Sequence, residues 1–169
     1  GVCAYNEELT KLGLTLPGFV ERNKIIASLP SLGLLTLAGM TPDEFDVEYL
    51  EISDIKEMKE LPNSFDLVAI SSYSAQIDEA YELSSLYRKK GIKTVIGGPH
   101  VTCEPDEARQ YCYSVVIGEG EATWQSLLSD FKHGNLKPFY KSQDSDFDMK
   151  NAPMPRFNLL NPEKYNRLT

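Results

Sequence analysis

The sequence predicts an α/β fold in which a mostly parallel β-sheet carries helices on both faces. Short β-branched runs alternate with amphipathic helical patterns along most of the chain, as expected for successive βαβ units. Two of these runs, Thr94–Ile96 and Ser114–Ile117, stop at glycine and lead into a helical pattern. Strands of a parallel sheet end in this way where their carboxyl ends face a ligand crevice. With 169 residues, the chain is long enough for one domain with its own core.

The first regular elements begin at residue 30. Leu32–Ala38 predicts a buried helix that is stopped by Gly39 and Pro42. Asp46–Ile52 alternates apolar residues with acids, which is typical of a partly exposed strand. Leu67–Ile70 is a continuous apolar run, which is typical of a buried parallel strand.

The second half of the chain continues the alternation. The clearest helix has Asp78 and Glu79 in its first turn and Arg88–Lys90 in its last. Both sets of charges interact favourably with the helix dipole. Gly91 follows as its expected C′ residue. Then come the strand Thr94–Ile96, a short helix opened by Pro105, the strand Ser114–Ile117, a helix with the core stripe Trp124, Leu127, Leu128 and Phe131, and an expected edge strand in Lys137–Lys141.

Composition excludes several classes of function. The net charge of -8 argues against a nucleic-acid partner, which needs a basic surface. No apolar run approaches the roughly 20 residues of a membrane span. Cys3, Cys103 and Cys112 are odd in number and lack C-x-x-C spacing, so buried or incidental thiols in a reducing cytoplasm are expected rather than disulfides or a zinc site.

Each motif that could bind a ligand or take part in catalysis also has a purely structural explanation. Gly118–Thr123 lacks the third glycine of a dinucleotide fingerprint, and its two glutamates would repel a pyrophosphate. The hydroxyls of Ser71–Ser74 could donate to a ligand or could cap the following helix. His100 could be a metal ligand, a general base or the polar end of a turn, and the lack of a second ligand at metal spacing favours a structural role. His133 is expected on the surface. We predict no catalytic residue and no metal ligand.

Four motifs then follow one another in a fixed order. They are Pro30-x-Leu32-Gly33-Leu34-Leu35-x-Leu37-Ala38, Asp66-Leu67-Val68-Ala69-Ile70-Ser71, Ile96-Gly97-Gly98-Pro99-His100-x-Thr102 and Gly118-Glu119-Gly120-Glu121-x-Thr123, with Ala152-Pro153-x-Pro155-Arg156 and Tyr165 closing the series. This order resembles the amino-terminal cobalamin-binding domain of radical SAM enzymes. That group includes the anaerobic magnesium-protoporphyrin monomethyl ester cyclases and the cobalamin-dependent methyltransferases.

The resemblance implies a Rossmann-like, flavodoxin-like sheet with cobalamin lying across the carboxyl ends of the strands. A side chain at Gly98 is expected to block the channel for the cofactor's nucleotide tail and to leave the fold intact. The cofactor-binding residues that the resemblance implies lie in three loops, and they are Ser71, Ser72, Tyr73, Gly97, Gly98, Pro99, His100, Gly118, Glu119, Gly120 and Glu121.

Two departures from the family pattern shape the expected cofactor set. The D-x-H-x-x-G motif is missing, so the cobalamin would be base-off with no histidine ligand, and His100 belongs to a different loop. The C-x-x-x-C-x-x-C motif is also missing, so a [4Fe–4S] cluster and S-adenosylmethionine would belong only to the parent protein.

The resemblance also divides the chain into three parts. We expect residues 1–29 to be a remnant of a first strand and loop, with Val2–Tyr5 as a possible strand end. Residues 30–141 would form the cobalamin-binding-like domain, and residues 142–169 a linker toward a missing radical SAM domain.

These expectations amount to one preferred function and two rivals. The chain would be a cobalamin-binding domain excised from a radical SAM enzyme, which methylates or cyclises a small-molecule substrate, and it would have no turnover alone. Its partner would be its own radical SAM domain. One rival is a degenerate structural or partner-contact domain that no longer binds corrinoid. The other is a stand-alone flavin or nucleotide module, which the lack of a phosphate loop disfavours.

Overall fold

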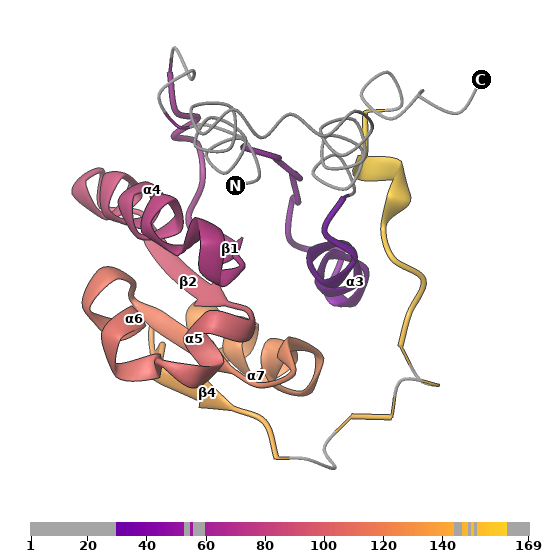
Figure 1. The fold of residues 1–169 in the computed structure, drawn as a ribbon. Helices are drawn as coiled ribbons and strands as arrows, with labels where there is room; N and C mark the ends of the chain where they lie inside the picture. Colours follow the sequence, from indigo (N-terminus) through magenta and orange to yellow (C-terminus); the bar gives the residue numbers. More distant parts are fainter. Residues whose placement is uncertain are drawn as a thin grey trace, which may run out of the picture.

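The sheet has four parallel strands in the order β1-β2-β3-β4. A computed structural model describes residues 30–52, 55, 60–143, 147–148, 150 and 152–161 of the chain. The predicted α/β class with a mostly parallel sheet is confirmed, and the expected edge strand is confirmed as the short strand beside β3 (Figure 1). The strands are β1 (Leu67–Ser71), β2 (Lys93–Gly97), β3 (Ser114–Ile117) and β4 (Phe139–Lys141).

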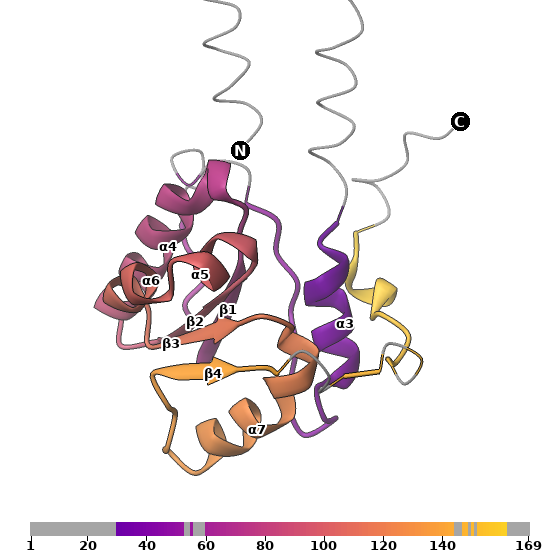
Figure 2. The same ribbon diagram turned by 60° about the horizontal axis from the view of Figure 1, so that its bottom comes forward.

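Helices cover both faces of the sheet, as predicted (Figures 1 and 2). One face packs against α4 (Ile77–Lys89), α5 (Pro99–Cys103) and α6 (Pro105–Tyr111), and the other against α3 (Leu32–Met40) and α7 (Gly120–Lys132). Because side chains alternate along a strand, Ile96 and Val115 join the first core and Val95 and Val116 the second. Short 3-10 turns lie at Ser74–Gln76 and Phe157–Leu159.

The helix after β1 has the predicted ends. Asp78 and Glu79 lie in its first turn and Arg88 and Lys89 in its last. Gly91 has φ +80°, which is the left-handed conformation of a C′ glycine. The buried face includes Tyr81 and Ser84, which the sequence pattern did not predict.

The strand expected at Asp46–Ile52 is wrong. Among the described residues this segment pairs with no strand, although its burial alternates as in a strand, with Val47 and Tyr49 half-buried and Asp46, Glu48 and Leu50 exposed. The hydroxyl of Tyr49 accepts a hydrogen bond from the Ser31 amide at 2.7 Å and donates to Glu51 at 3.0 Å. The segment is therefore held by the start of α3 and not by a neighbouring strand.

The first described helix is longer and less buried than predicted. Leu35 and Ala38 lie in the core, but Leu32 is 59% exposed. The helix continues past Gly39 to Met40. Glycine at position 39 leaves room for the Met154 carbonyl oxygen, which would lie 2.6 Å from a Cβ there. The possible strand end at Val2–Tyr5 lies outside the described residues.

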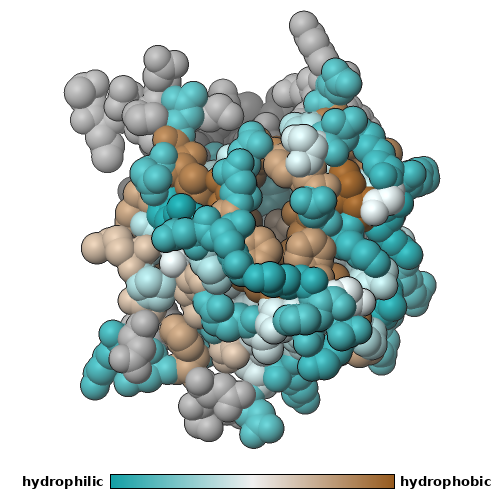
Figure 3. All heavy atoms as spheres, turned by 180° about the vertical axis from the view of Figure 1, so that it is seen from behind, coloured by the Kyte–Doolittle hydropathy of each residue, from teal (hydrophilic) through white to brown (hydrophobic). Residues whose placement is uncertain are grey.

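The two described cysteines, Cys103 and Cys112, are free thiols. Cys112 is buried, and burial raises the pKa of its thiol to about 11, while Cys103 is exposed. The described residues contain no group of three side chains able to hold a metal ion. None of their helices is both long enough and apolar enough to cross a membrane. Seen from behind, the surface is largely polar with scattered apolar patches (Figure 3).

A buried hydrogen bond between α3 and α7 provides a test of this packing. The indole Nε1 of Trp124 donates to the Thr41 hydroxyl at 2.9 Å, and both side chains are buried. We expect Thr41→Val to lower the free energy of unfolding by about 1–3 kcal/mol, because the indole N–H loses its acceptor. Urea denaturation followed by the fluorescence of the single tryptophan measures this.

The matched control is Thr36→Val on the same helix. The Thr36 hydroxyl donates only to the Leu32 carbonyl within α3, at 2.9 Å. Its removal leaves no unpaired donor, so a change within about 0.5 kcal/mol is expected. Equal losses for the two variants would contradict the role of the Trp124–Thr41 bond.

Candidate functional site

The carboxyl ends of β1, β2 and β3 meet at one edge of the sheet because the strands are parallel. A cavity of about 170 Å³ lies there, between the strand ends and the first turns of α3 and α7. We call it the strand-end cavity. It is lined by Gly33, Leu34, Leu37, Ala69, Ile70, Ser71, Val95, Gly97, Gly98, Val116, Gly118, Glu119, Gly120, Glu121 and Trp124.

Five of these lining residues are glycines, and two of them are required by the backbone itself. Gly98 has φ +121°, and a Cβ there would lie 2.5 Å from the Ser72 carbonyl oxygen. Gly118 has φ +81°, and a Cβ there would meet the Ser142 hydroxyl. The expectation that a side chain at Gly98 leaves the fold intact is therefore wrong, because this glycine lets two loops pass closely.

In contrast to Gly98 and Gly118, Gly33 is not required by the backbone. It lies in the first turn of α3, and a Cβ there would meet nothing within 4 Å. Glycine in a helix interior costs up to about 1 kcal/mol relative to alanine. A glycine in this leucine-rich helix is therefore not explained by packing, and it leaves the cavity open. Gly33 belongs to the family motif at residues 30–38, but it was not among the predicted cofactor-binding residues.

Of the three residues after the central strand, one lines the cavity. Ser71 lies on its wall. The buried hydroxyl of Ser72 donates a hydrogen bond to the Tyr73 carbonyl at 3.1 Å. The Ser72 amide donates to the Gly97 carbonyl at the end of β2. Tyr73 is 71% exposed and outside the lining. Neither the 3-10 turn Ser74–Gln76 nor α4 has a side chain that caps its first turn. Among the described residues, the serines of Ser71–Ser74 therefore do not cap the following helix.

Hydrogen bonds hold the other two loops together. The Thr102 hydroxyl donates to the Gly98 carbonyl at 3.0 Å and accepts the Gly118 amide at 3.0 Å. The Glu119 amide donates to the Ser142 hydroxyl at 2.8 Å. The loop after β2 is thus linked to the loop after β3, and that loop to the residues after β4. Thr102 and Ser142 were missed as supports of the site.

Neither histidine of the chain lines the strand-end cavity. The Nε2 atom of His100 lies 3.6 Å from a Glu107 carboxylate oxygen, and its ring meets the edge of Tyr81. Burial raises the pKa of Tyr81, and the neighbouring Glu107 raises it further. His133 lies at the far end of α7, with Nδ1 2.7 Å from the Ser129 carbonyl oxygen. Pro99 is the first residue of α5 and also lies outside the lining.

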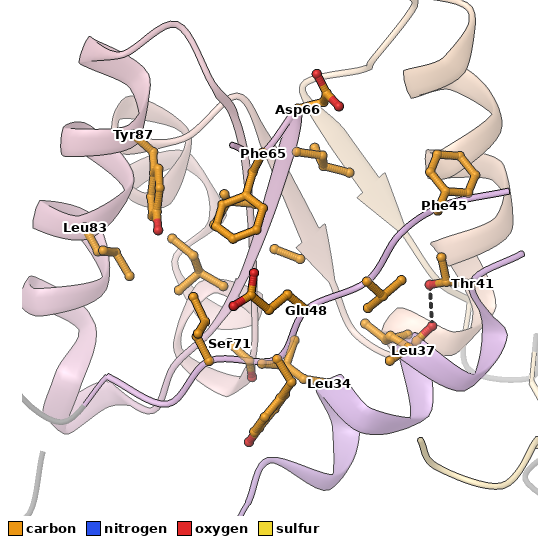
Figure 4. A pocket seen from close by; sticks show the side chains of 18 of the residues that line it. Leu34, Leu37, Thr41, Phe45, Glu48, Phe65, Asp66, Ser71, Leu83 and Tyr87 are labelled. Carbon is orange, nitrogen blue, oxygen red and sulfur yellow. Dashed lines mark hydrogen bonds between the residues drawn. The ribbon is translucent and has the colours of Figure 1, made fainter. Parts of the chain in front are cut away.

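A second, larger cavity of about 520 Å³ adjoins β1 on the side away from β2 (Figure 4). Its walls come from β1 itself, from α3 and α4, and from the segment 44–52 that follows α3. We call it the β1-side cavity. Ser71 and the α3 residues Leu34 and Leu37 border both cavities.

Comparison with known proteins identifies the family of this fold and site. The model of the B12-binding domain family matches residues 22–128, which include β1 to β3 and every residue of the strand-end cavity. The chain belongs to the B12-binding domain family. The resemblance to cobalamin-binding domains is therefore confirmed.

Relatives of this B12-binding domain are named as methyltransferases. Bacteriochlorophyllide d C-8(2)-methyltransferase of Chlorobaculum tepidum is 32% identical over 114 residues, which cover 68% of the chain and 25% of that protein. The C-12(1)-methyltransferase of the same organism is 32% identical over 117 residues, 69% of the chain and 25% of that protein. Hopanoid C-2 methylase of Rhodopseudomonas palustris is 23% identical over 97% of the chain and 32% of that protein. The chain spans about a quarter of the length of the first two.

Among solved structures, the N-terminal domain of a hypothetical protein of Thermotoga maritima is similar to this B12-binding domain. The match has a TM-score of 0.45 and 26% identity, and it covers 69% of the chain and 88% of that structure.

The two kinds of glycine in the B12-binding domain predict opposite effects of alanine. Gly98→Ala should lower the free energy of unfolding by about 1 kcal/mol or more, because of the positive φ and the Ser72 contact. Gly33→Ala should raise it by up to about 1 kcal/mol, because alanine favours the helix and meets open space. Urea denaturation of both variants measures the difference. A stable Gly98→Ala protein would contradict the close passage of the two loops.

Proposed function

We propose that this B12-binding domain holds cobalamin with the nucleotide tail in the strand-end cavity and the corrin ring across the strand ends. The observation that carries the proposal is the wall of that cavity, to which α3, the end of β2 and the turn from β3 into α7 contribute five glycines. Of these five, Gly33 borders open space, so no side chain at that position stands in the way of a narrow ligand.

The lining residues fit such a tail in chemistry as well as in shape. The Ser71 hydroxyl can donate to phosphate or amide oxygens, and the carboxylate of Glu121 can accept from amide N–H groups. Gly97, Gly98 and the Gly118–Gly120 loop supply close backbone contact. Ser72, Tyr73, Pro99 and His100 shape these loops from outside the lining.

We propose that the cofactor is bound base-off, because its nucleotide tail would be held in the strand-end cavity, and that this chain offers the cobalt no histidine ligand. The support is the position of both histidines, His100 beside Glu107 and His133 at the end of α7. Bound cobalamin supplies a metal centre that can carry a methyl group. What the chain itself does is bind and orient the cofactor.

The parent protein is proposed to be a radical SAM methyltransferase. Methyl transfer is preferred to cyclisation because the relatives are named as methyltransferases. The [4Fe–4S] cluster, S-adenosylmethionine and a small-molecule substrate would belong to the parent's radical SAM domain, which is the proposed partner of this one. The free Cys103 and Cys112 thiols fit a reducing cytoplasm. The family match favours this proposal over a domain that has lost its corrinoid.

Titration with hydroxocobalamin, followed by visible absorbance, tests the cavity. We expect saturable binding to the wild-type chain and at least about tenfold weaker binding to Gly33→Trp, because the indole fills the open space in front of α3. Gly33→Ala is the matched control and should bind like the wild type. Circular dichroism checks that both variants fold. Equal affinity for Gly33→Trp, or no saturable change in the wild type at millimolar cofactor, would contradict the proposal.

The visible spectrum also tests the ligand of the cobalt. His100→Gln should leave the band positions of bound cobalamin unchanged at pH 6 and at pH 8, because the imidazole faces Glu107 and Tyr81 and not the cavity. A shift of the bands in this variant, but not in His133→Gln, would show that His100 ligates the metal.

A further inference from the structure

The strand-end cavity has an apolar floor. Five apolar side chains of its lining belong to one core cluster, and we call them the cavity floor: Leu37, Ala69, Val95, Val116 and Trp124. Val95, Val116 and Trp124 are no more than 7% exposed. The indole N–H of Trp124 already donates to the Thr41 hydroxyl. The side chains of the cavity floor therefore offer a ligand no free hydrogen-bonding group.

The polar side chains of the lining belong to the opening of the cavity. Ser71 and Glu119 are exposed, and Glu121 is half-buried. Because these side chains reach solvent, they lie at the opening rather than beside the cavity floor. They can therefore contact only the part of a ligand that stays near the opening.

The backbone beside the cavity is occupied as well. The carbonyl oxygens of Gly97 and Gly98 accept hydrogen bonds from within the protein. The amides of Gly118 and Glu119 donate to side-chain hydroxyls of neighbouring loops. A loop that binds phosphate instead leaves its amides free for the ligand. These backbone groups therefore add little polar character to the cavity.

The size of the cavity suits a small aromatic group. Its volume is about 170 Å³, and an apolar cavity of roughly 150 Å³ in another protein stays dry and binds benzene. Val116 faces two glycines of the wall. A Cβ built on Gly97 would lie 3.5 Å from the Val116 Cβ, and one built on Gly120 would lie 3.9 Å from its Cγ1. A flat apolar ring is therefore the kind of group that the cavity floor accepts.

We infer that the strand-end cavity selects a corrinoid by its lower base, and that it takes a benzimidazole and rejects an adenine. The inference rests on the proposed function, which puts the nucleotide tail in this cavity. The base is the far end of that tail, so it would reach the cavity floor. The phosphate and ribose would stay near Ser71 and the glutamates at the opening.

The two bases differ in their polar atoms, and the cavity floor distinguishes them for this reason. A benzimidazole that has left the cobalt carries a single free ring nitrogen. Adenine carries further ring nitrogens and an exocyclic amino group. At the cavity floor each of these groups would lose water and gain no partner among the described residues, which is unfavourable. Leaving such a group unpaired weakens binding by about tenfold or more.

Equilibrium dialysis of the wild-type chain against three corrinoids tests the inference. They are hydroxocobalamin, its analogue with an adenine lower base, and cobinamide, which has no nucleotide tail. We expect hydroxocobalamin to bind at least about tenfold more tightly than the adenine analogue, and more tightly than cobinamide. Adenine leaves cobalt more easily than benzimidazole does, so the cost of detaching the base cannot produce this preference.

The other outcomes separate this inference from the proposed function. If the adenine analogue binds as tightly as hydroxocobalamin, and both bind more tightly than cobinamide, the selection of the base is overturned and the tail remains in the cavity. If cobinamide binds as tightly as hydroxocobalamin, or no corrinoid binds saturably at millimolar concentration, the proposed function is contradicted and the inference with it.

Two valine variants on β3 test the contact with the cavity floor. Val116→Thr places a hydroxyl there and should reduce the preference for benzimidazole over adenine by about threefold or more. Val115→Thr is the matched control, because Val115 belongs to the core cluster on the other face of the sheet and does not line the cavity. It should keep the wild-type preference. Circular dichroism checks that both variants fold. The same preference in both folded variants would overturn the inference, because the base would then not lie against the cavity floor.

Discussion

The close passage of the Gly98 backbone against Ser72 is the constraint on which the site depends. It brings the loop after β2 against the end of β1, and the Thr102 hydroxyl then joins the same loop to Gly118 after β3. The three loops are thus held in register by the close backbone contact at Gly98 and by the Thr102 side chain. Neither Ser72 nor Thr102 lines the strand-end cavity, so the groups that hold its wall together do not occupy it.

The helix α3 lines both cavities, together with β1 and Trp124 of α7, so its attachment matters for each. It is fixed to α7 by the Trp124–Thr41 hydrogen bond and by the bond from the Gln125 side chain to the Met40 carbonyl. Just beyond its end, the ion pair of Lys132 with Glu44 joins the same two regions at 2.8 Å. On its other side the Arg156 amide donates to the Leu35 carbonyl at 3.0 Å, so residues 152–156 run along it. The position of Gly33 over the strand ends follows from these contacts.

Sequence reasoning located the elements whose pattern is local. The apolar run of β1, the charged ends of α4 and the core stripe of α7 each reflect properties of the residues themselves. The segment Asp46–Ile52 was misassigned because a strand also requires a neighbour, and no pattern within seven residues can show whether one is present. The sequence likewise shows a glycine at 98 but neither its φ of +121° nor the carbonyl in front of it. Only an unfavourable glycine in a leucine-rich helix pointed to Gly33, and that signal needs the helix to be known first.

The size of the strand-end cavity determines how the proposed cofactor can be held. Ligand sites that bury most of a drug-sized molecule have volumes of roughly 300–1,000 Å³. At about 170 Å³, this cavity has room only for the narrow end of the proposed cofactor and would leave the corrin ring outside. Leu32 beside Gly33 and Tyr73 beside the end of β1 are 59% and 71% exposed at this edge, so apolar surface is available to a large ring and to whatever covers it. The matched region covers a quarter of each of the two bacteriochlorophyllide methyltransferases, so most of those two proteins lies outside it. We therefore expect this chain to bind cobalamin weakly, because the strand-end cavity would enclose only part of the cofactor.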